Sequence, residues 1–223
     1  MVMLKYISFF VFSFLFISIF GQYKIAVKEK SVQFNDGNFN AFSVEVFELS
    51  LKEVEKLWKK EMKDMKANVS TKKNEMKGDD ARVKSMGENT FDIYAKTKQQ
   101  DNGVEIAIAF DLGGAFLSSS QHADKAKEMR RRVYSFAVSA TKQGIRGILK
   151  QEQKKQADLE KQQADLVKEK EKLEKNIEDW KKSIEKAKND IQTNLKNQDK
   201  KKVEVEEQKK VVQGVEQKEK AVK

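Results

Sequence analysis

The fold of this chain is decided by the stretch LEKQQADLVKEKEKLEKNIEDWKKSIEKAKNDI, residues 159–191. One apolar series recurs in it every seven residues, and a second apolar series follows the first by four. The predicted seam consists of seven residues: Leu159, Leu166, Leu173, Ile177, Trp180, Ile184 and Ile191. This a/d spacing is typical of a coiled coil. It persists over more residues than a helix in a globular core needs. A lone helix cannot bury such a stripe, so we predict that another helix covers it.

The same heptad phase continues towards the end of the chain, through Ala187, Val205, Val212, Val215 and Val222. Polar residues interrupt it at Asn194, Gln198, Lys201 and Gln208. Two arrangements are compatible with this pattern. One is a continuous rod, which the unbroken phase favours, and the other is a hairpin whose tip is Asn197-Gln198-Asp199.

Residues 22 to about 120 alternate mainly in the manner of strands. We expect strands at 23–27 and 42–46, with a turn at Asn35-Asp36-Gly37 between them. A weaker hairpin is expected in 69–84, with Gly78-Asp79-Asp80 as its turn. Two further alternating runs, 91–96 and 104–110, predict an antiparallel pair around Asp101-Asn102-Gly103.

Two helices are expected to accompany these strands. Ser50 and Glu53 have the spacing of a capping box, and they precede apolar residues at helical spacing over about 16 residues: Val54, Leu57, Trp58, Met62 and Met65. A second helix is entered through Ser118-Ser119-Ser120. Its predicted buried face contains Ala126, Met129, Val133, Phe136, Ala137 and Ala140.

The second helix contains Gly144 and Gly147, each of which weakens a helix by about 1 kcal/mol relative to Ala. No proline or turn cluster ends it there. We therefore predict an α+β fold, in which two helices cover one face of an antiparallel sheet and the last helix extends into a long C-terminal coiled-coil arm.

The N-terminus has the features of an export signal. Lys5 precedes an apolar run, 7–20, that is shorter than the roughly 20 residues of a spanning helix. Cleavage after Gly21 is the expected outcome, and an uncleaved anchor is the alternative because Ile19 is not a small residue. The predicted organisation is a signal peptide at 1–21, a head domain at 22–150 and a helical arm at 151–223.

Composition limits the chemistry that the chain can perform. It has no cysteine and a single histidine, His122, which rules out thiolate metal sites and thiol nucleophiles. The formal net charge of +10 falls to +9 without Lys5. Such a balance favours anionic envelope polymers or lipid as partners, although mixed charges on solvated faces also explain it. No cofactor, metal or nucleic acid is expected.

Three motifs are candidates for a functional site. Gly113-Gly114, before a helix, could present N–H groups to an anion, but a tight turn explains the pair equally simply. A hydrolase using Asp111 and His122 would need these side chains within hydrogen-bond reach. Arg130-Arg131-Arg132 cannot form one phosphate-binding stripe, because consecutive helical residues point in different directions, and at least one stem should pack beside the sheet.

The layout also resembles a group of uncharacterised exported proteins from Bacteroidota. The resemblance covers most of the chain. It rests on the leader ending Phe20-Gly21-Gln22, the helical segment Val54-Glu55-Lys56-Leu57-Trp58-Lys59, the segment 110–119 and the Lys/Glu-rich arm. It implies an exported protein with this architecture, and it implies no activity.

Two principal hypotheses about function follow from the sequence. The first is a non-enzymatic interaction or scaffold protein of the periplasm or cell envelope, which assembles with itself or with another helical protein through the coiled coil. The second is a binding module whose head recognises an anionic envelope component, with the arm as a spacer.

Overall fold

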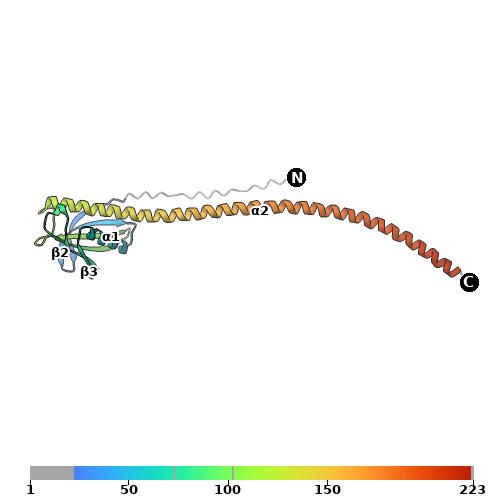
Figure 1. The fold of residues 1–223 in the computed structure, drawn as a ribbon, viewed down its shortest axis with the longest axis horizontal. Helices are drawn as coiled ribbons and strands as arrows, with labels where there is room; N and C mark the ends of the chain where they lie inside the picture. Colours follow the sequence, from blue (N-terminus) through green and yellow to red (C-terminus); the bar gives the residue numbers. More distant parts are fainter. Residues whose placement is uncertain (1–22, 73, 102, 222–223) are drawn as a thin grey trace. The chain divides into compact units, whose positions relative to one another are not determined.

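The computed structural model describes residues 23–72, 74–101 and 103–221, and the predicted leader lies outside them. In chain order the elements are β1 (Lys28–Phe34), β2 (Gly37–Phe47), α1 (Leu51–Asp64), β3 (Asn68–Lys72), β4 (Glu75–Ala81), the 3-10 helix η1 (Lys84–Met86), β5 (Phe91–Gln100), β6 (Gly103–Asp111) and α2 (Ala123–Ala221) (Figure 1). The chain divides into two compact units, Met1–Gln151 and Glu152–Lys223, called here the head and the arm. The α+β fold is confirmed.

The six strands form one antiparallel sheet in the order β1-β2-β6-β5-β4-β3. The predicted turn between the first two strands is present, with Gly37 at the positive φ of 142°. Strands β5 and β6 pair throughout, from Asp92 with Asp111 to Gln100 with Gly103. The antiparallel pair predicted for 91–96 and 104–110 is therefore confirmed. Asn102, in the turn between these strands, lies outside the described residues.

The first strand begins later than the sequence predicted. Residues 23–27 form no ladder, and β1 starts at Lys28. The ring of Tyr23 packs on Phe47 with centroids 4.9 Å apart, while Ile25 and Val27 lie against the main core. The period-2 pattern of 23–27 therefore reflects a segment with one packed side and no strand partner.

Gly78-Asp79-Asp80 does not form the predicted turn, because all three residues lie within β4. The connection between β3 and β4 comes earlier, where Asn74 adopts a φ of 64°. A Cβ on Gly78 would lie 2.7 Å from Met62 Cε and 3.0 Å from Ala67 Cβ. This glycine thus permits close packing, and its strand has an irregular register between Gly78 and Ala81.

Both predicted helices are present. The capping box is formed, since the Ser50 side chain accepts from the Glu53 N–H and the Glu53 side chain accepts from the Ser50 N–H. Helix α1 is slightly shorter than expected, at 14 residues. Helix α2 is a single helix of 99 residues. Asn197-Gln198-Asp199 are helical within it, so the hairpin alternative is wrong.

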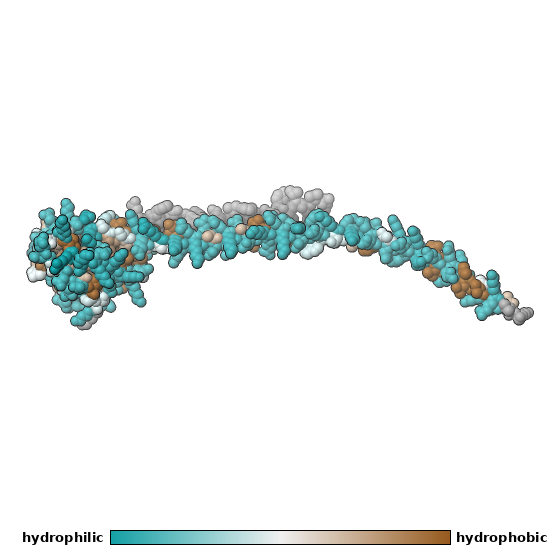
Figure 2. Space-filling model, viewed as in Figure 1, coloured by the Kyte–Doolittle hydropathy of each residue, from teal (hydrophilic) through white to brown (hydrophobic). Residues whose placement is uncertain are grey.

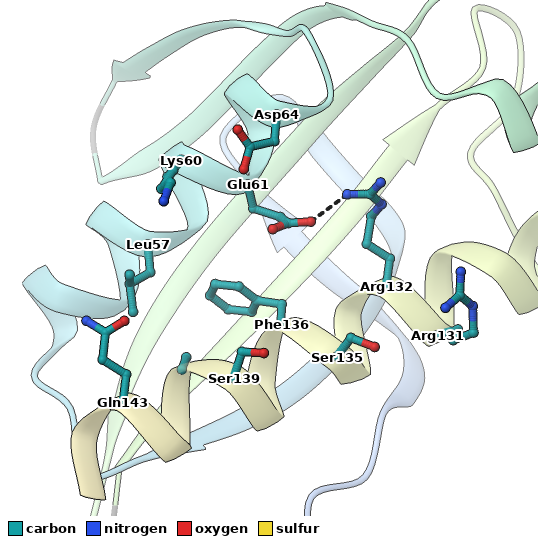
Figure 3. A pocket seen from close by; sticks show the side chains of 11 residues that line it. Leu57, Lys60, Glu61, Asp64, Arg131, Arg132, Ser135, Phe136, Ser139 and Gln143 are labelled. Carbon is teal, nitrogen blue, oxygen red and sulfur yellow. Dashed lines mark hydrogen bonds and ion pairs between the residues drawn. The ribbon is translucent and has the colours of Figure 1, made fainter. Parts of the chain in front are cut away.

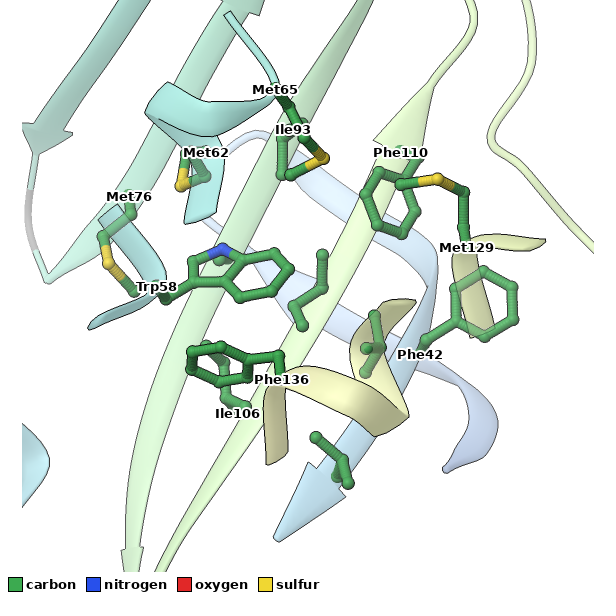
Figure 4. Close-up of a cluster of buried hydrophobic side chains, with 14 of the residues drawn as sticks. Phe42, Trp58, Met62, Met65, Met76, Ile93, Ile106, Phe110, Met129 and Phe136 are labelled. Carbon is green, nitrogen blue, oxygen red and sulfur yellow. The ribbon is translucent and has the colours of Figure 1, made fainter. Parts of the chain in front are cut away.

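One face of the sheet packs against both helices to form the main core (Figure 4). Trp58 of α1 and Phe136 of α2 meet edge to face there, with ring centroids 4.8 Å apart. The alternate residues of β2, β5 and β6 point into this core. All six residues predicted for the buried face of α2 are buried: Ala126, Met129, Val133, Phe136, Ala137 and Ala140.

The opposite face of the sheet carries a second, smaller core that the sequence did not predict. It consists of Phe34, Phe39, Ala41, Ala107 and Ala109, with Val32, Tyr94 and Phe116 packed against it. The backbone N–H of Asn35, in the β1–β2 turn, donates to Glu75 Oε2 at 2.9 Å although β1 and β4 are not neighbours. The sheet therefore curls around these aromatic side chains.

Candidate coiled-coil interface

The seven predicted seam residues all lie on α2 in the arm, and all are exposed. The exposed fraction of their side chains runs from 48% at Ile177 to 66% at Leu166. Figure 2 shows apolar patches on this helix among mostly hydrophilic side chains. Their large apolar side chains are therefore uncovered by any part of the chain that the structure describes.

The two apolar series can be assigned to heptad positions. The second series follows the first by four residues, so the first occupies d and the second occupies a. The d positions from 159 to 187 then hold Leu159, Leu166, Leu173, Trp180 and Ala187. The apolar a positions hold Ile177, Ile184, Ile191, Val205 and Val212, and the polar residues Gln163, Lys170 and Gln198 occupy three other a positions. In a parallel coil, β-branched residues at a with Leu at d favour two strands.

The seam has an uneven polarity along its length. Asn194, Gln198, Lys201 and Gln208 occupy four of its positions, and the Gln198 side-chain amide donates to Asn194 Oδ1 within the same helix. Val222, the last predicted seam residue, lies outside the described residues. Of the four polar residues, Gln198 lies at an a position and the other three lie at d positions. A polar residue in the seam lowers the stability of a coiled coil, so this part of the seam should be the weaker one.

The seam phase begins before the arm. Ile145 occupies a d position and Leu149 an a position, and their side chains are 39% and 54% exposed. Gly144, on the neighbouring face of the helix, is buried against the head. Helix α2 therefore presents two faces near residue 145, one packed on the head and one exposed.

The charged residues of the arm pair along the helix. Six ion pairs are present in the described arm, and each joins residues three or four apart, as Lys170 Nζ and Glu174 Oε1 do at 3.5 Å. Exposed pairs of this kind contribute roughly 0.3–0.5 kcal/mol each. They support the helix, and two of them involve lysines at seam positions, Lys170 and Lys201.

The three consecutive arginines do not form one stripe, as predicted, and each pairs with a different acidic residue. Arg130 lies over the ring of Phe42 and binds Glu29 of β1 at 2.8 Å. Arg131 pairs with Glu128 on its own helix, and Arg132 pairs with Glu61 of α1 at 2.6 Å. These arginines stabilise the head and do not form one phosphate-binding surface.

Glu29 is a half-buried structural carboxylate that the sequence did not reveal. Its burial opposes ionisation, but hydrogen bonds from the Ser119 side chain and backbone, a hydrogen bond from Asn40 and the charge of Arg130 outweigh it. The pKa of Glu29 is therefore lowered. No local pattern marks this residue, because its partners lie far from it in the sequence.

A cleft of about 400 Å³ lies between α1 and α2 in the head (Figure 3). Leu57 and Phe136 supply its apolar lining, and the Arg132–Glu61 ion pair joins its two sides. The lining also contains Lys60 and Asp64, so both signs of charge face the same space. The cleft is therefore the groove between two neighbouring helices, α1 and α2.

The remaining sequence motifs have structural explanations. Gly113 has a φ of 87°, and its N–H donates to Asp111 Oδ1 at 2.9 Å, so the glycine pair forms a tight turn. His122 is half-buried, and its Nδ1 has no hydrogen-bond partner among the described residues. The described residues include both Asp111 and His122, and these two side chains form no hydrogen bond with each other.

The described residues are 23–72, 74–101 and 103–221. They contain no cluster of three or more His, Cys, Asp or Glu side chains placed to bind a metal ion. No helix among them combines the length and apolarity needed to cross a bilayer. Comparison with known proteins found no matching family model, no matching curated protein and no matching solved structure. Function is therefore inferred from the residues and their geometry.

Proposed function

We propose that this protein is a non-enzymatic, exported interaction or scaffold protein of the cell envelope, and that it assembles by pairing α2 with the α2 of a second copy in a parallel two-stranded coiled coil. The observation that carries the proposal is the exposed seam, whose apolar positions recur in one heptad phase across the arm.

Energetics support pairing. A Leu or Ile side chain contributes roughly 1.5–3 kcal/mol when it passes from full exposure to full burial. Seven half-exposed seam residues on each of two chains can therefore offset the estimated association cost of about 4–15 kcal/mol. In a parallel coil of two copies, the β-branched residues at a and the leucines at d favour two strands.

Substitution at the seam tests the assembly. In the purified chain, Ile184→Asp should weaken dimerisation at least about 100-fold, since two carboxylates would enter an apolar layer. The matched control is Asn189→Asp, which adds the same charge at an f position on the outer face and should leave the dimer intact. Analytical ultracentrifugation measures both. A monomer at micromolar concentration, unchanged by Ile184→Asp, would refute self-assembly.

Crosslinking tests the direction of the coil. The chain has no cysteine, so Ile184→Cys introduces a single thiol. In a parallel, in-register coil this position meets its own copy, and oxidation should give a covalent dimer. Asn189→Cys should give much less. A dimer that forms in solution and does not crosslink at position 184 would exclude the parallel arrangement and retain the seam.

A further inference from the structure

The positive charge of the chain is concentrated in the helices of the head. Residues 51–66 contain six lysines and four acidic residues, and residues 123–151 contain eight Lys and Arg against two acidic residues. The rest of the head behaves differently, since 23–50 and 67–122 together contain ten basic and twelve acidic residues. The helices that cover the sheet are therefore basic, while the strand and loop segments are slightly acidic.

Helix α1 carries a straight stripe of lysines on its outer face. Lys52, Lys56, Lys59 and Lys63 follow one another by four, three and four residues, which places them on one side of the helix. The buried residues Val54, Trp58 and Met62 lie on the other side. We call these four residues the lysine stripe.

Three of the four acidic residues of α1 have partners outside the lysine stripe, and the fourth, Asp64, lines the cleft between α1 and α2. Glu53 is engaged with Ser50 in the capping box, Glu55 accepts from the Thr97 hydroxyl at 2.8 Å, and Glu61 pairs with Arg132. Among the ion pairs of the described residues, none involves a lysine of the stripe. Its four ammonium groups are therefore available to an anionic partner.

The shape of this surface selects the kind of partner. The shallow depression beside the stripe is lined by residues of α1 alone: Lys52, Glu55, Lys56, Lys59, Lys60 and Lys63. It is the outer surface of one helix, which suits an extended charged surface better than a small ligand. Lysines act as point charges and do not form the bidentate fork of arginine. The one aromatic side chain of α1, Trp58, is fully buried, so the stripe lacks the stacking groups used for single-stranded nucleic acids.

We propose that the lysine stripe docks the head onto a membrane surface rich in anionic lipid headgroups. Each Lys near such a surface strengthens binding about fivefold, and the attraction decays within a Debye length. This interaction is separate from coiled-coil pairing, because the stripe lies in the head and the seam residues lie on the arm.

The test compares two sets of four substitutions in the full chain, purified as the cell produces it. The first set is Lys52→Gln, Lys56→Gln, Lys59→Gln and Lys63→Gln. The control set removes the same charge from f positions of the arm, opposite the seam: Lys161→Gln, Lys168→Gln, Lys175→Gln and Lys196→Gln. Gln is a good helix former, so both sets should keep the fold, which circular dichroism checks.

Binding is measured by co-sedimentation with vesicles of phosphatidylcholine, with or without phosphatidylglycerol. The unsubstituted chain should bind the phosphatidylglycerol vesicles at low salt and lose most of that binding near 1 M salt, where the Debye length is about 3 Å. The stripe variant should bind about 100-fold or more weakly, and the arm variant should stay within a few-fold of the unsubstituted chain.

Three outcomes would overturn the proposal. The first is that the unsubstituted chain does not bind phosphatidylglycerol vesicles. The second is an equal loss in the stripe and arm variants, which would attribute binding to net charge alone. The third is that dextran sulfate, an anionic polysaccharide, binds through the stripe under conditions where the vesicles do not.

Discussion

The head and the arm use the same apolar pattern with opposite results. Between Ala126 and Ala140 the apolar stripe of α2 is buried against the sheet, whereas from Leu159 onward the stripe is half-exposed or more. The two tryptophans express the difference most clearly, since Trp58 is fully buried and Trp180 is 62% exposed. Amphipathic spacing therefore identifies the apolar face of the helix. Whether the same chain buries that face depends on which other elements pack against it.

The largest expected effect separates the two tryptophans. Trp58→Ala should lower the free energy of unfolding of the head by about 3–5 kcal/mol, because it removes a large side chain from a packed core. Trp180→Ala should leave the head unchanged and weaken only the concentration-dependent association of the arm. Urea unfolding, followed by hydrogen exchange of the β5 and β6 amides, measures the head in both variants.

Similar losses from the two tryptophan substitutions would break the comparison. Such a result would mean that the apolar face of the arm is covered as tightly as the core of the head. The assignment of Trp180 to an intermolecular interface would then have to be abandoned.

The two glycines of α2 provide a second, smaller test. A Cβ on Gly144 would lie 2.3 Å from the backbone oxygen of Glu48, whereas nothing lies within 4 Å of one on Gly147. Gly144→Ala should therefore destabilise the head by about 1–3 kcal/mol through overpacking. Gly147→Ala should stabilise it by up to about 1 kcal/mol through helix propensity. Thermal unfolding of both variants gives the two signs, and a gain in both would contradict the packing at Glu48.

The smallest effect concerns Glu29 and pH. Its pKa is lowered in the folded head, so ionised Glu29 stabilises the fold above the ordinary carboxyl pKa of 4.5. That contribution is lost as the pH falls below this value through the folded pKa. Glu29→Gln should cost about 1 kcal/mol near pH 7 and reduce the acid sensitivity of the head. Denaturant titrations from pH 7 to about pH 3 measure this, and parallel pH curves for both proteins would exclude the role of Glu29.

Much of the fold could be predicted from short-range patterns. The capping box at Ser50 and Glu53, the buried face of α2 from Ala126 to Ala140 and the β5–β6 pair all depend on residues close in sequence. The seam was predicted in the same way, from spacing alone, and its exposure fits an unpaired helix. Its burial by a second helix stays a prediction.

The two wrong predictions concern local sequence patterns that occur in more than one kind of structure. The sequence around Gly78 predicts a turn, but in the structure this glycine permits close packing against Met62 and Ala67. The alternating residues 23–27 were assigned to a strand, but they pack on one side without a ladder. In both cases the local pattern is present, but contacts with residues distant in sequence determine which structure it forms.

The sequence by itself determined which segments are helical or extended and which of their faces are apolar, because these properties follow from residue spacing along the backbone. Only the tertiary structure decided the curl of the sheet, the second core and the contact of Asn35 with Glu75, 40 residues apart. The physical reason is that such contacts join side chains whose separation in sequence carries no period. They are fixed when the whole sheet twists and its buried polar groups find partners.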